Sequence, residues 1–431
     1  MLAKSVMVSI SPIEETFLGC GPPGLVPPDP LADLQANLLL LVDDAVGGSV
    51  LFVSLDVLYA GPKIRKALEL GLSGLLEPDQ IFLAASHTHA APNLDETKPR
   101  LGKVISTHLE RVSRLLVESA LSLFENSFFV EVEPEIRQFA SNIVVNRRRV
   151  VPISYRNGRI QIFRAEFLPN RKQTPTVSSE LVNFRDSQGQ IAACIWIMPC
   201  HPISKPDPRR LSPDFVGDVR SGYRSELMGG NSGAFIFLQG ASGDLRPPSH
   251  RKRKWLGLKN ILINLVYGAT FLSFSTEEYG AWLSRLKAEL NSASPIKPIS
   301  ESQDDGKGEV RVRRHEIPLG DFFDVSDSSR KMSFHEVIIS GFRIAGISAE
   351  PTWEFRTEVH EKLFRDVNWG SLVGCVDDTF GYAVTERQAR FGGYEASGFL
   401  PSFSLRRKRG VNTLRGLKIS FTSFLEPQGP V

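Results

Sequence analysis

Six short apolar runs, rich in branched and aromatic side chains, constrain the fold of this chain more than any other feature of its sequence. Each run holds four to eight residues, which is typical of strands that are buried on both faces. The runs are residues 50–55, 81–85, 191–198, 234–238, 344–347 and 372–376. They predict a β-sheet core whose faces are covered by other elements.

Helical patterns lie between these runs. Apolar residues recur at spacings of three and four from about residue 103 to 125, which predicts an amphipathic helix. Ser275 followed by Glu278 forms a capping-box pattern that begins another helix, and residues 355–363 mark a third. The Arg/Val alternation at 310–314 is typical of antiparallel strands. Together these patterns predict an α/β fold, a mixed β-sheet core flanked by helices.

Composition places the chain among ordinary globular enzymes and excludes disordered and fibrous classes. It has 431 residues, of which 42% are hydrophobic and 23% charged. The net charge of +3, from 51 basic and 48 acidic residues, gives no global field that would attract nucleic acid. The four cysteines are scattered and form no C-x-x-C pair, so we expect them to be reduced and mostly buried.

We expect residues 1–431 to form a single catalytic domain with two distinctive segments. Residues 250–274 form an apolar and basic insertion, and residues 292–308, rich in Pro, Ser and Asp, predict an exposed connection. The first residues hold one lysine and a broken apolar stretch that is too short for the core of a secretory signal. A cytoplasmic location is therefore the expectation.

A potential metal ligand follows each of four strand-like runs. His87 and His89 follow 81–85, His201 follows 191–198, Glu350 follows 344–347, and Tyr382 comes after 372–376. The carboxyl ends of strands form the ligand crevice of an α/β sheet, so these side chains are able to converge although they are far apart in sequence. We expect one sheet edge to hold the whole site.

The residue types fit zinc chemistry. In an extended chain, His-x-His places both imidazoles on the same side, so that one can bind a metal while the other faces substrate. Imidazole with carboxylate suits Zn²⁺, which lowers the pKa of bound water to about 7 and so provides a nucleophile for an unreactive amide. The alternative of equal weight is that His87 and His89 belong to a polar loop or a hydrogen-bonded core.

Three acidic residues have structural interpretations of their own. The alternative role of Glu350 is a helix start, because Pro351 is a favoured first helical residue and an acidic group there meets the positive end of the helix dipole. Asp214 and Asp244 are expected to stabilise turns, and they can orient ligand histidines by hydrogen bonds.

Five segments, in this order along the chain, resemble the amino-terminal catalytic domain of the neutral, non-lysosomal ceramidase family. They are AASHTHAAP, PCHPIS with SPDFVGDVR, FLQGASGDLRP, GISAEPTWEF and GYAVTERQARFGGYEAS. The family's motifs read approximately THTHSGP, HPT with a downstream S-x-D, Gly-Asp after a buried strand, PGEF, and a Tyr before YEA. The similarity spans nearly the whole chain.

The resemblance implies a zinc-dependent amidohydrolase that cleaves an N-acyl amide of the ceramide type. The implied zinc ligands are His87, His201, Glu350 and Tyr382. Zinc would activate a water molecule for attack on the amide carbonyl. A phenol oxygen is an unusual zinc ligand, and the alternative for Tyr382 is a hydrogen bond to Glu350 or to water.

The resemblance also implies catalytic roles for His89, Tyr394 and Arg147. His89 and Tyr394 would contact the substrate amide, and either would stabilise the developing oxyanion, with His89 as the proton donor to the leaving amine. Tyr394 follows Tyr382 by 394 − 382 = 12 residues, which matches the family's spacing. Arg147 is in register with an arginine that the family uses.

The chain departs from the family at the substrate-facing wall and in the insertion. Ala90, Ala91 and Pro92 stand where the family has Ser-Gly-Pro. In the insertion, four basic residues at 251–254 precede Trp255 and an apolar stretch too short to span a bilayer. One hypothesis is a lip that touches an anionic membrane near the substrate entrance, and the alternative is a buried helix with a solvated basic cap.

Two further functions compete with the leading one. A zinc-dependent N-deacetylase acting on an amino sugar or a cell-envelope precursor would use the same metal site with another substrate. A non-catalytic binding protein would retain the fold alone, and the four intact ligand positions argue against it.

Overall fold

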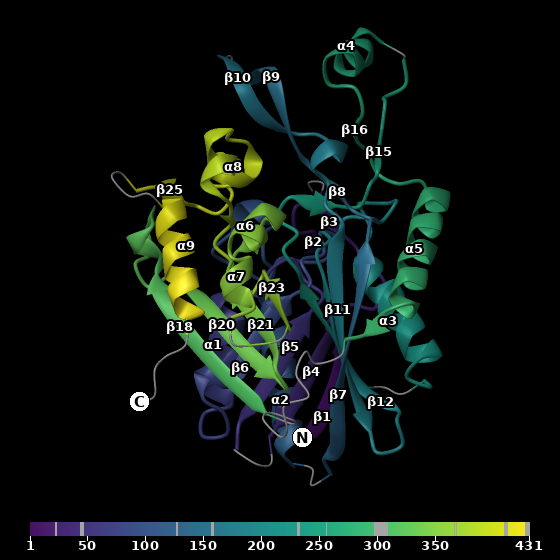
Figure 1. Ribbon diagram of the computed structural model, residues 1–431, viewed down its shortest axis with the longest axis vertical. Coiled ribbons are helices and arrows are strands. Elements are labelled where there is room, and N and C mark those ends of the chain that lie inside the picture. The colour runs from purple at the N-terminus through teal and green to yellow at the C-terminus, as the bar shows by residue number, and fades with distance from the viewer. Residues whose placement is uncertain are drawn as a thin grey trace.

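The computed structural model shows a mixed α/β molecule, with strands at its centre and helices outside (Figure 1). It describes residues 1–21, 24–43, 47–125, 128–156, 159–230, 233–255, 257–296, 309–365, 367, 369–408 and 413–426. Of the predicted connection 292–308, only residues 292–296 lie within the described part. The predicted α/β class with a mixed sheet is confirmed.

The larger sheet has nine strands, in the order β13-β12-β11-β7-β1-β4-β5-β6, with β17 beside β7. Its β5/β6 and β12/β13 pairs are parallel, and the other pairs are antiparallel. The strands are β1 (Leu2–Ser9), β4 (Gln35–Val42), β5 (Ser49–Leu55), β6 (Ile81–Ala85), β7 (Val130–Ser141), β11 (Val177–Asp186), β12 (Ile191–Met198), β13 (Phe235–Gln239) and β17 (Ser294–Pro295).

The larger sheet turns a corner between β1 and β7, where only Leu2 and Ala3 are paired with the longer strand. The two halves fold toward each other, so that β13, at one end of the strand order, lies against β5 near the other end. Ser54 Oγ on β5 donates to the Phe237 carbonyl on β13 at 2.7 Å. This fold brings the carboxyl ends of β6 and β12 to the same region.

A second sheet has the order β18-β20-β21-β23, formed by β18 (Val310–Pro318), β20 (Lys331–Ile339), β21 (Phe342–Ile347) and β23 (Trp369–Val373). Only its β21/β23 pair is parallel. Beyond β23 the chain passes between the two halves of the larger sheet. Gly374 N–H donates to the Gln239 carbonyl at 2.8 Å, and Asp377 N–H donates to the Leu83 carbonyl at 3.0 Å. Both sheets are thereby joined at their carboxyl ends.

Alternate residues of the buried strands belong to different apolar cores, as the period of two requires. On β12, Ile195 and Ile197 face a core shared with β20 and β21, whereas Trp196 and Met198 face the core with α3 and α5. A third core contains α1, α2 and the carboxy-terminal helices. Apart from α4 (Leu258–Tyr267), which lies in the insertion, the helices of the described residues are α1 (Gly61–Gly71), α2 (Ser106–Glu125), α3 (Asp214–Glu226), α5 (Thr276–Asn291), α6 (Trp353–Glu358), α7 (His360–Leu363), α8 (Glu386–Arg390) and α9 (Thr413–Phe424).

Two of the predicted helices are present with small shifts at their ends, whereas the third, predicted at 355–363, is divided at Val359 into α6 and α7. The amphipathic helix begins at Ser106 and ends at Glu125. Ser275 caps α5 by accepting from the Glu278 N–H, and the Glu278 side chain accepts from the Ser275 N–H, so the predicted capping box is confirmed. None of the helices that the structure describes is both long and apolar enough to cross a bilayer.

Two segments project from the end of the molecule at which the strand carboxyl ends meet (Figure 1). One is the hairpin of β9 (Arg148–Arg156) and β10 (Arg159–Phe167). The other holds α4 (Leu258–Tyr267), between β15 (His250–Arg251) and β16 (Thr270–Phe271). The insertion at 250–274 is therefore a projection from the surface. The interpretation as an ordinary buried helix is wrong, because Leu258 and Leu265 are 73% and 69% exposed.

Candidate metal centre

The predicted ligands come together, but from two sheets. His87 and His201 follow β6 and β12 of the larger sheet, whereas Glu350 lies just beyond β21 of the smaller one. Glu350 lies on the two-residue strand β22 (Glu350–Pro351), which pairs in parallel with β24 (Tyr382–Ala383) and places Tyr382 directly beside Glu350. The expectation that one sheet edge holds the site is corrected: the carboxyl ends of both sheets form it.

Glu350 is part of a strand and does not begin a helix. The helix α6 begins at Trp353, and its cap is Thr352, whose side chain accepts from the Phe355 N–H. The interpretation of Pro351 as the first helical residue is therefore wrong. The neighbouring Gly243 explains the close packing here, because a Cβ at that position would lie 2.7 Å from the Glu350 carbonyl oxygen.

The hydrogen bonds of both histidines fix which ring nitrogen is free. His87 Nδ1 lies 3.2 Å from the Leu58 carbonyl, and His201 Nδ1 lies 2.7 Å from the Ser242 carbonyl. A carbonyl oxygen only accepts, so each Nδ1 carries the proton and each Nε2 presents a lone pair. Burial is the main cause that lowers the pKa of His201 to about 4, which keeps its ring neutral.

The Glu350 carboxylate lies between the two free nitrogens. Its Oε2 atom is 3.1 Å from His201 Nε2 and 3.4 Å from His87 Nε2, while Tyr59 O–H donates to its Oε1 at 2.6 Å. Burial raises the pKa of Glu350, whereas positive charge and hydrogen bonds from the facing histidines lower it well below its usual range. An ionised carboxylate at this point therefore requires a positive charge beside it, carried by a histidine or by a metal ion.

Two imidazole nitrogens and one carboxylate oxygen thus converge on one buried point. Oε2 of Glu350 is fully buried and has no hydrogen-bond partner among the residues that the structure describes. A buried carboxylate oxygen that faces two imidazole lone pairs is unfavourable, unless a cation lies among them. The side chains of His87, His201 and Glu350 therefore fit a metal ion, and two nitrogens with one carboxylate oxygen suit zinc.

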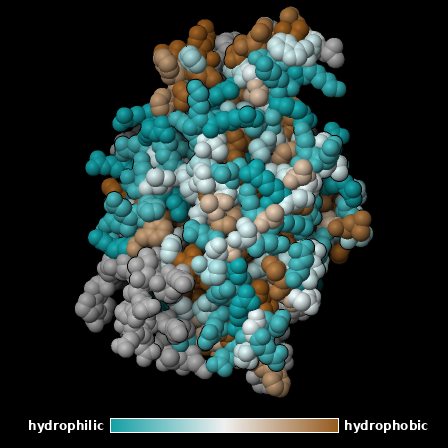
Figure 2. All heavy atoms as spheres, turned by 45° about the vertical axis from the view of Figure 1, so that its right-hand side comes forward, coloured by the Kyte–Doolittle hydropathy of each residue, from teal (hydrophilic) through white to brown (hydrophobic). Residues whose placement is uncertain are grey.

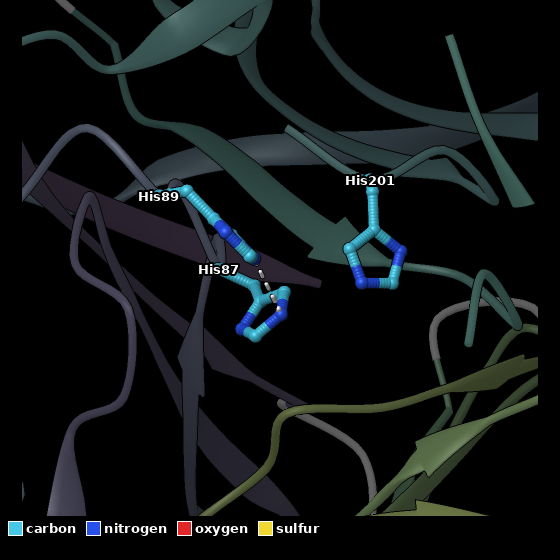
Figure 3. A group of neighbouring side chains, drawn as sticks. All are labelled: His87, His89 and His201. Atoms are coloured by element: carbon cyan, nitrogen blue, oxygen red, sulfur yellow. Dashed lines mark hydrogen bonds between the residues drawn. The ribbon is translucent and has the colours of Figure 1, made fainter. Parts of the chain in front are cut away.

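His89 lies close enough to offer a further nitrogen. His89 Nε2 is 3.4 Å from His87 Nε2, and the rings of His87, His89 and His201 face one another (Figure 3). One nitrogen from each of these three residues lies within 4.8 Å of the others. Burial, followed by the neighbouring His87, lowers the pKa of His89 well below its usual value. His89 is less buried than the other two, and it lines the cavity.

Arg147 lies beside the centre, where it contacts two other predicted site residues, His201 and Tyr382. Its Nη1 is 3.2 Å from His201 Nε2, and its Nη2 donates to the Tyr382 hydroxyl at 3.1 Å. Its Nε donates to Glu395 at 2.8 Å, and this ion pair is buried on both sides. The same Glu395 binds Arg148, so the carboxylate holds both arginines in place.

The two predicted tyrosines are neighbours. The rings of Tyr382 and Tyr394 meet edge to face with centroids 5.6 Å apart. Burial raises the pKa of both phenols, with the Glu350 charge as a further cause for each, so both hydroxyls stay protonated at neutral pH. Tyr394 begins the helical turn Tyr394–Gly398. Direct ligation of a metal by Tyr382 stays a prediction.

Asp214 and Asp244 stabilise loops, as expected. Asp214 accepts from the Ser204 N–H at 3.0 Å and so holds the segment that follows His201. Asp244 accepts from Asn146 at 3.0 Å and from the Trp353 N–H at 2.8 Å. The carbonyls that bind His201 Nδ1 belong to Ser242 and Leu245, on either side of Asp244, so Asp244 also positions a candidate ligand.

A cavity of about 580 Å³ opens beside the centre. This volume lies in the range of about 300–1,000 Å³ that holds drug-sized ligands. Polar groups line the inner part, and Leu101, Phe167 and Ile203 contribute apolar walls. The polar lining residues include Tyr59, His87, His89, Arg147, Tyr382 and Tyr394.

Tyr59 and Glu395 have roles that the sequence did not reveal. Tyr59 orients Glu350, and Glu395 anchors Arg147. Tyr59 follows β5 without a motif of its own, so no local signal marks it. Glu395 lies in the Tyr-Glu-Ala segment next to Tyr394, and that adjacency was the only available signal.

Comparisons with known proteins support the resemblance at the level of the fold. No protein-family model matches the chain, and no curated protein sequence matches it. Among solved structures, a neutral ceramidase from Pseudomonas aeruginosa superimposes with a TM-score of 0.68 over 98% of this chain and 74% of that chain, at 12% identity.

A second solved structure, a ceramidase complexed with C2, gives a TM-score of 0.69 at 11% identity, again over 98% of this chain and 74% of the other. The chain therefore has the fold of the neutral ceramidases. The predicted architecture and the resemblance are confirmed at that level.

Proposed function

We propose that the chain is a zinc-dependent amidohydrolase that cleaves the amide of a ceramide-like N-acyl lipid. The observation that carries the proposal is the convergence of three lone pairs, from His87, His201 and Glu350, on one buried point beside a cavity. The shared fold of the neutral ceramidases supports the reaction class.

Zinc held by these residues, with Tyr382 as the proposed fourth ligand, would polarise the amide carbonyl and lower the pKa of a water molecule. The protein's own contribution is to exclude bulk solvent and to fix the ligands. His87 and His201 are held by backbone carbonyls, and Glu350 is held by Tyr59. A ligand set fixed in this way needs no rearrangement to bind a cation.

His89 and Tyr394 are the proposed catalytic residues on the substrate side. Both line the cavity, so they are placed to contact an amide that enters it. Tyr394 keeps its phenolic proton, and its O–H can donate to a carbonyl oxygen that gains negative charge. His89, whose ring is neutral, can take a proton and pass it to the leaving nitrogen. Arg147 adds a fixed positive charge behind Tyr382.

The cavity lining favours a lipid amide over an amino sugar. Leu101, Phe167 and Ile203 give apolar walls that suit an alkyl chain. Phe167 lies at the base of the projecting hairpin, so a long chain would leave the cavity along that side.

A substrate panel with ligand variants tests the proposal. We expect zinc-loaded protein to hydrolyse N-acyl sphingoid bases faster than N-acetylated amino sugars, and His87→Ala to lose at least about a thousandfold in kcat/KM. His360→Ala, an exposed histidine on α7, is the matched control and should retain full activity. Faster turnover of the sugars would identify an amino sugar, and not a lipid, as the substrate. Activity of His87→Ala equal to that of the wild type would overturn the metal mechanism.

A further inference from the structure

The two projections carry large apolar side chains that face solvent. On the β9–β10 hairpin, Ile160 and Ile162 are each 71% exposed, and on α4, Leu258 is 73% exposed. Figure 2 shows hydrophobic side chains gathered at this end of the molecule. We call these exposed residues the tip surface: Ile153, Ile160, Ile162, Phe163, Trp255, Leu258, Leu265 and Val266.

The projections are joined at their bases, and their tips extend from the same end of the molecule (Figure 1). The rings of Phe167 and Phe271 meet edge to face with centroids 5.4 Å apart. The Arg246 guanidinium lies over both rings, at 5.5 and 4.3 Å from their centroids. Arg149 also donates a hydrogen bond to the Tyr267 carbonyl at the end of α4.

The charge near the tips has one sign. Residues 149–165 and 250–272 contain no Asp or Glu, and residues 250–272 contain five Lys or Arg. Lys252 and Lys254 are exposed beside the tip residue Trp255, and the Lys252 ammonium lies 5.9 Å from the centre of its ring, whereas Arg251 pairs with Glu278 at 2.9 Å. This arrangement, with aromatic and aliphatic tips next to cations, matches the chemistry of an anionic lipid surface.

The bases of the two projections, below the tip surface, border the cavity. Phe167, at the end of β10, and Ser273, just after β16, both line the cavity. The two projections therefore continue outward from the walls of the substrate site. A membrane in contact with the tips would lie on the side of the molecule toward which these walls extend.

We propose that the tip surface docks on an anionic lipid bilayer, so that the cavity draws its substrate from the membrane. The apolar tips would enter the interfacial region while the cations meet lipid phosphates. A second copy of this chain is a poorer occupant, since it would bring two surfaces of like charge together. The identity of the substrate as a membrane lipid rests on the proposed function, whereas the docking does not.

Vesicle flotation with the full chain tests the proposal. We expect wild-type protein to bind vesicles of phosphatidylcholine with phosphatidylglycerol at least about tenfold more tightly than vesicles of phosphatidylcholine alone. The charge variant Lys252→Glu/Lys254→Glu and the apolar variant Ile162→Ser/Phe163→Ser should each reduce binding to the anionic vesicles by about tenfold or more.

Matched controls lie far from the tips. Leu70→Ser removes an equally exposed leucine on α1, and Arg114→Glu reverses an exposed charge on α2. Both should bind vesicles as the wild type does. All variants alter exposed residues, so hydrolysis of a short-chain, water-soluble amide should be unchanged in each of them.

Three outcomes decide between the occupants. Docking is overturned if wild-type protein does not bind anionic vesicles, or if the tip variants bind them as tightly as the wild type. A second copy becomes the occupant if the tip variants abolish a dimer in sedimentation velocity while vesicle binding is absent. Vesicle binding without hydrolysis of any amide leaves docking intact and overturns the proposed function alone.

Discussion

The candidate metal centre and the tip surface both depart from the usual placement of polar side chains outside and apolar side chains inside. The centre buries ionisable groups: His87, His201 and Glu350 are each no more than 2% exposed. The tip surface exposes aliphatic and aromatic groups, such as Ile162 and Phe163 at 71% and 62%. Water stabilises neither arrangement, so each region indicates a partner that the folded chain alone does not supply.

The expected partners differ because the two regions present different chemical groups. Two imidazole nitrogens and a carboxylate that converge on one buried point are suited to a cation, whereas apolar tips beside lysines are suited to an anionic lipid surface. The cavity is lined both by His87 of the centre and by Phe167 at the base of the projecting hairpin. The comparison predicts that damage to one region leaves the other intact.

The largest expected effect is in the centre, from Glu350→Gln. The variant loses one anionic ligand, and we expect amide hydrolysis to fall at least about a thousandfold. In metal-free protein, however, the new amide can donate to a histidine Nε2, so the variant should be at least as stable as metal-free wild type. Vesicle binding should be unchanged.

Thermal unfolding of both proteins, with and without zinc, measures this difference. Zinc should raise the melting temperature of the wild type more than that of the variant. A metal-free Glu350→Gln protein that is much less stable than metal-free wild type would show that the carboxylate has a structural role instead.

The next effect is a difference in stability between two substitutions of isoleucine, one in the buried core and one on the tip surface. Ile344→Ser, in the core between the sheets, should lower the free energy of unfolding by about 3–5 kcal/mol, because it leaves a cavity and buries a hydroxyl. Ile162→Ser on the hairpin should change it by no more than about 0.5 kcal/mol. Urea denaturation measures both, and a large loss from Ile162→Ser would mean that the tip is packed in solution.

A third effect concerns acid stability and His335, a buried histidine outside the centre. Its Nε2 faces the Asp79 carbonyl at 2.7 Å and its ring stacks on Phe82. Burial is the main cause that lowers its pKa to about 4. The unfolded chain therefore binds this proton between about pH 6.5 and 4 while the folded chain does not, so stability falls as the pH falls through that window.

The variant His335→Gln tests the contribution. Between about pH 6.5 and 4, its free energy of unfolding should fall by about 3 kcal/mol less than that of the wild type, since a shift of one pKa unit corresponds to about 1.4 kcal/mol. His315→Gln, on the exposed side of β18, is the control and should keep the wild-type slope. Equal slopes for all three proteins would refute the assignment.

The smallest expected effect comes from a substitution of Tyr382, which distinguishes two roles of its hydroxyl group, as a metal ligand or as a hydrogen-bonding group only. The phenol beside Glu350 is the proposed fourth ligand, and Tyr382→Phe should weaken zinc affinity by about 10–100-fold. If the hydroxyl only forms hydrogen bonds, kcat falls while zinc affinity stays at the wild-type value. Competition with a zinc-binding dye measures the affinity, and steady-state kinetics measures kcat.

Local sequence patterns predicted the strands, the capped helix and the ligand positions. Strand-like runs before His87, His201 and Glu350 placed these residues at strand ends, and the structure brings the three together. The patterns did not show that two sheets share the site. The connection after β23 joins the sheets through Gly374 and Asp377, and such long-range pairing leaves no mark in local periodicity.

The roles of other residues could be assigned only from their tertiary contacts. Tyr59 and Glu395 act through partners hundreds of residues away, at positions 350 and 147. Pro351 satisfied a helix-start rule, but pairing of Glu350 with Tyr382 overrides that local preference. The hairpin β9–β10 did have a signal, an Asn-Gly pair at 157–158 between alternating apolar residues.

Metal content of purified protein tests the central claim most directly. After dialysis against buffer that contains zinc and then against zinc-free buffer, mass spectrometry of the elements should find about one zinc ion per wild-type chain. The double variant His87→Ala/His201→Ala should hold none, while the control His360→Ala keeps the wild-type amount. A wild-type chain without tightly bound zinc, or a double variant that retains it, would contradict the account.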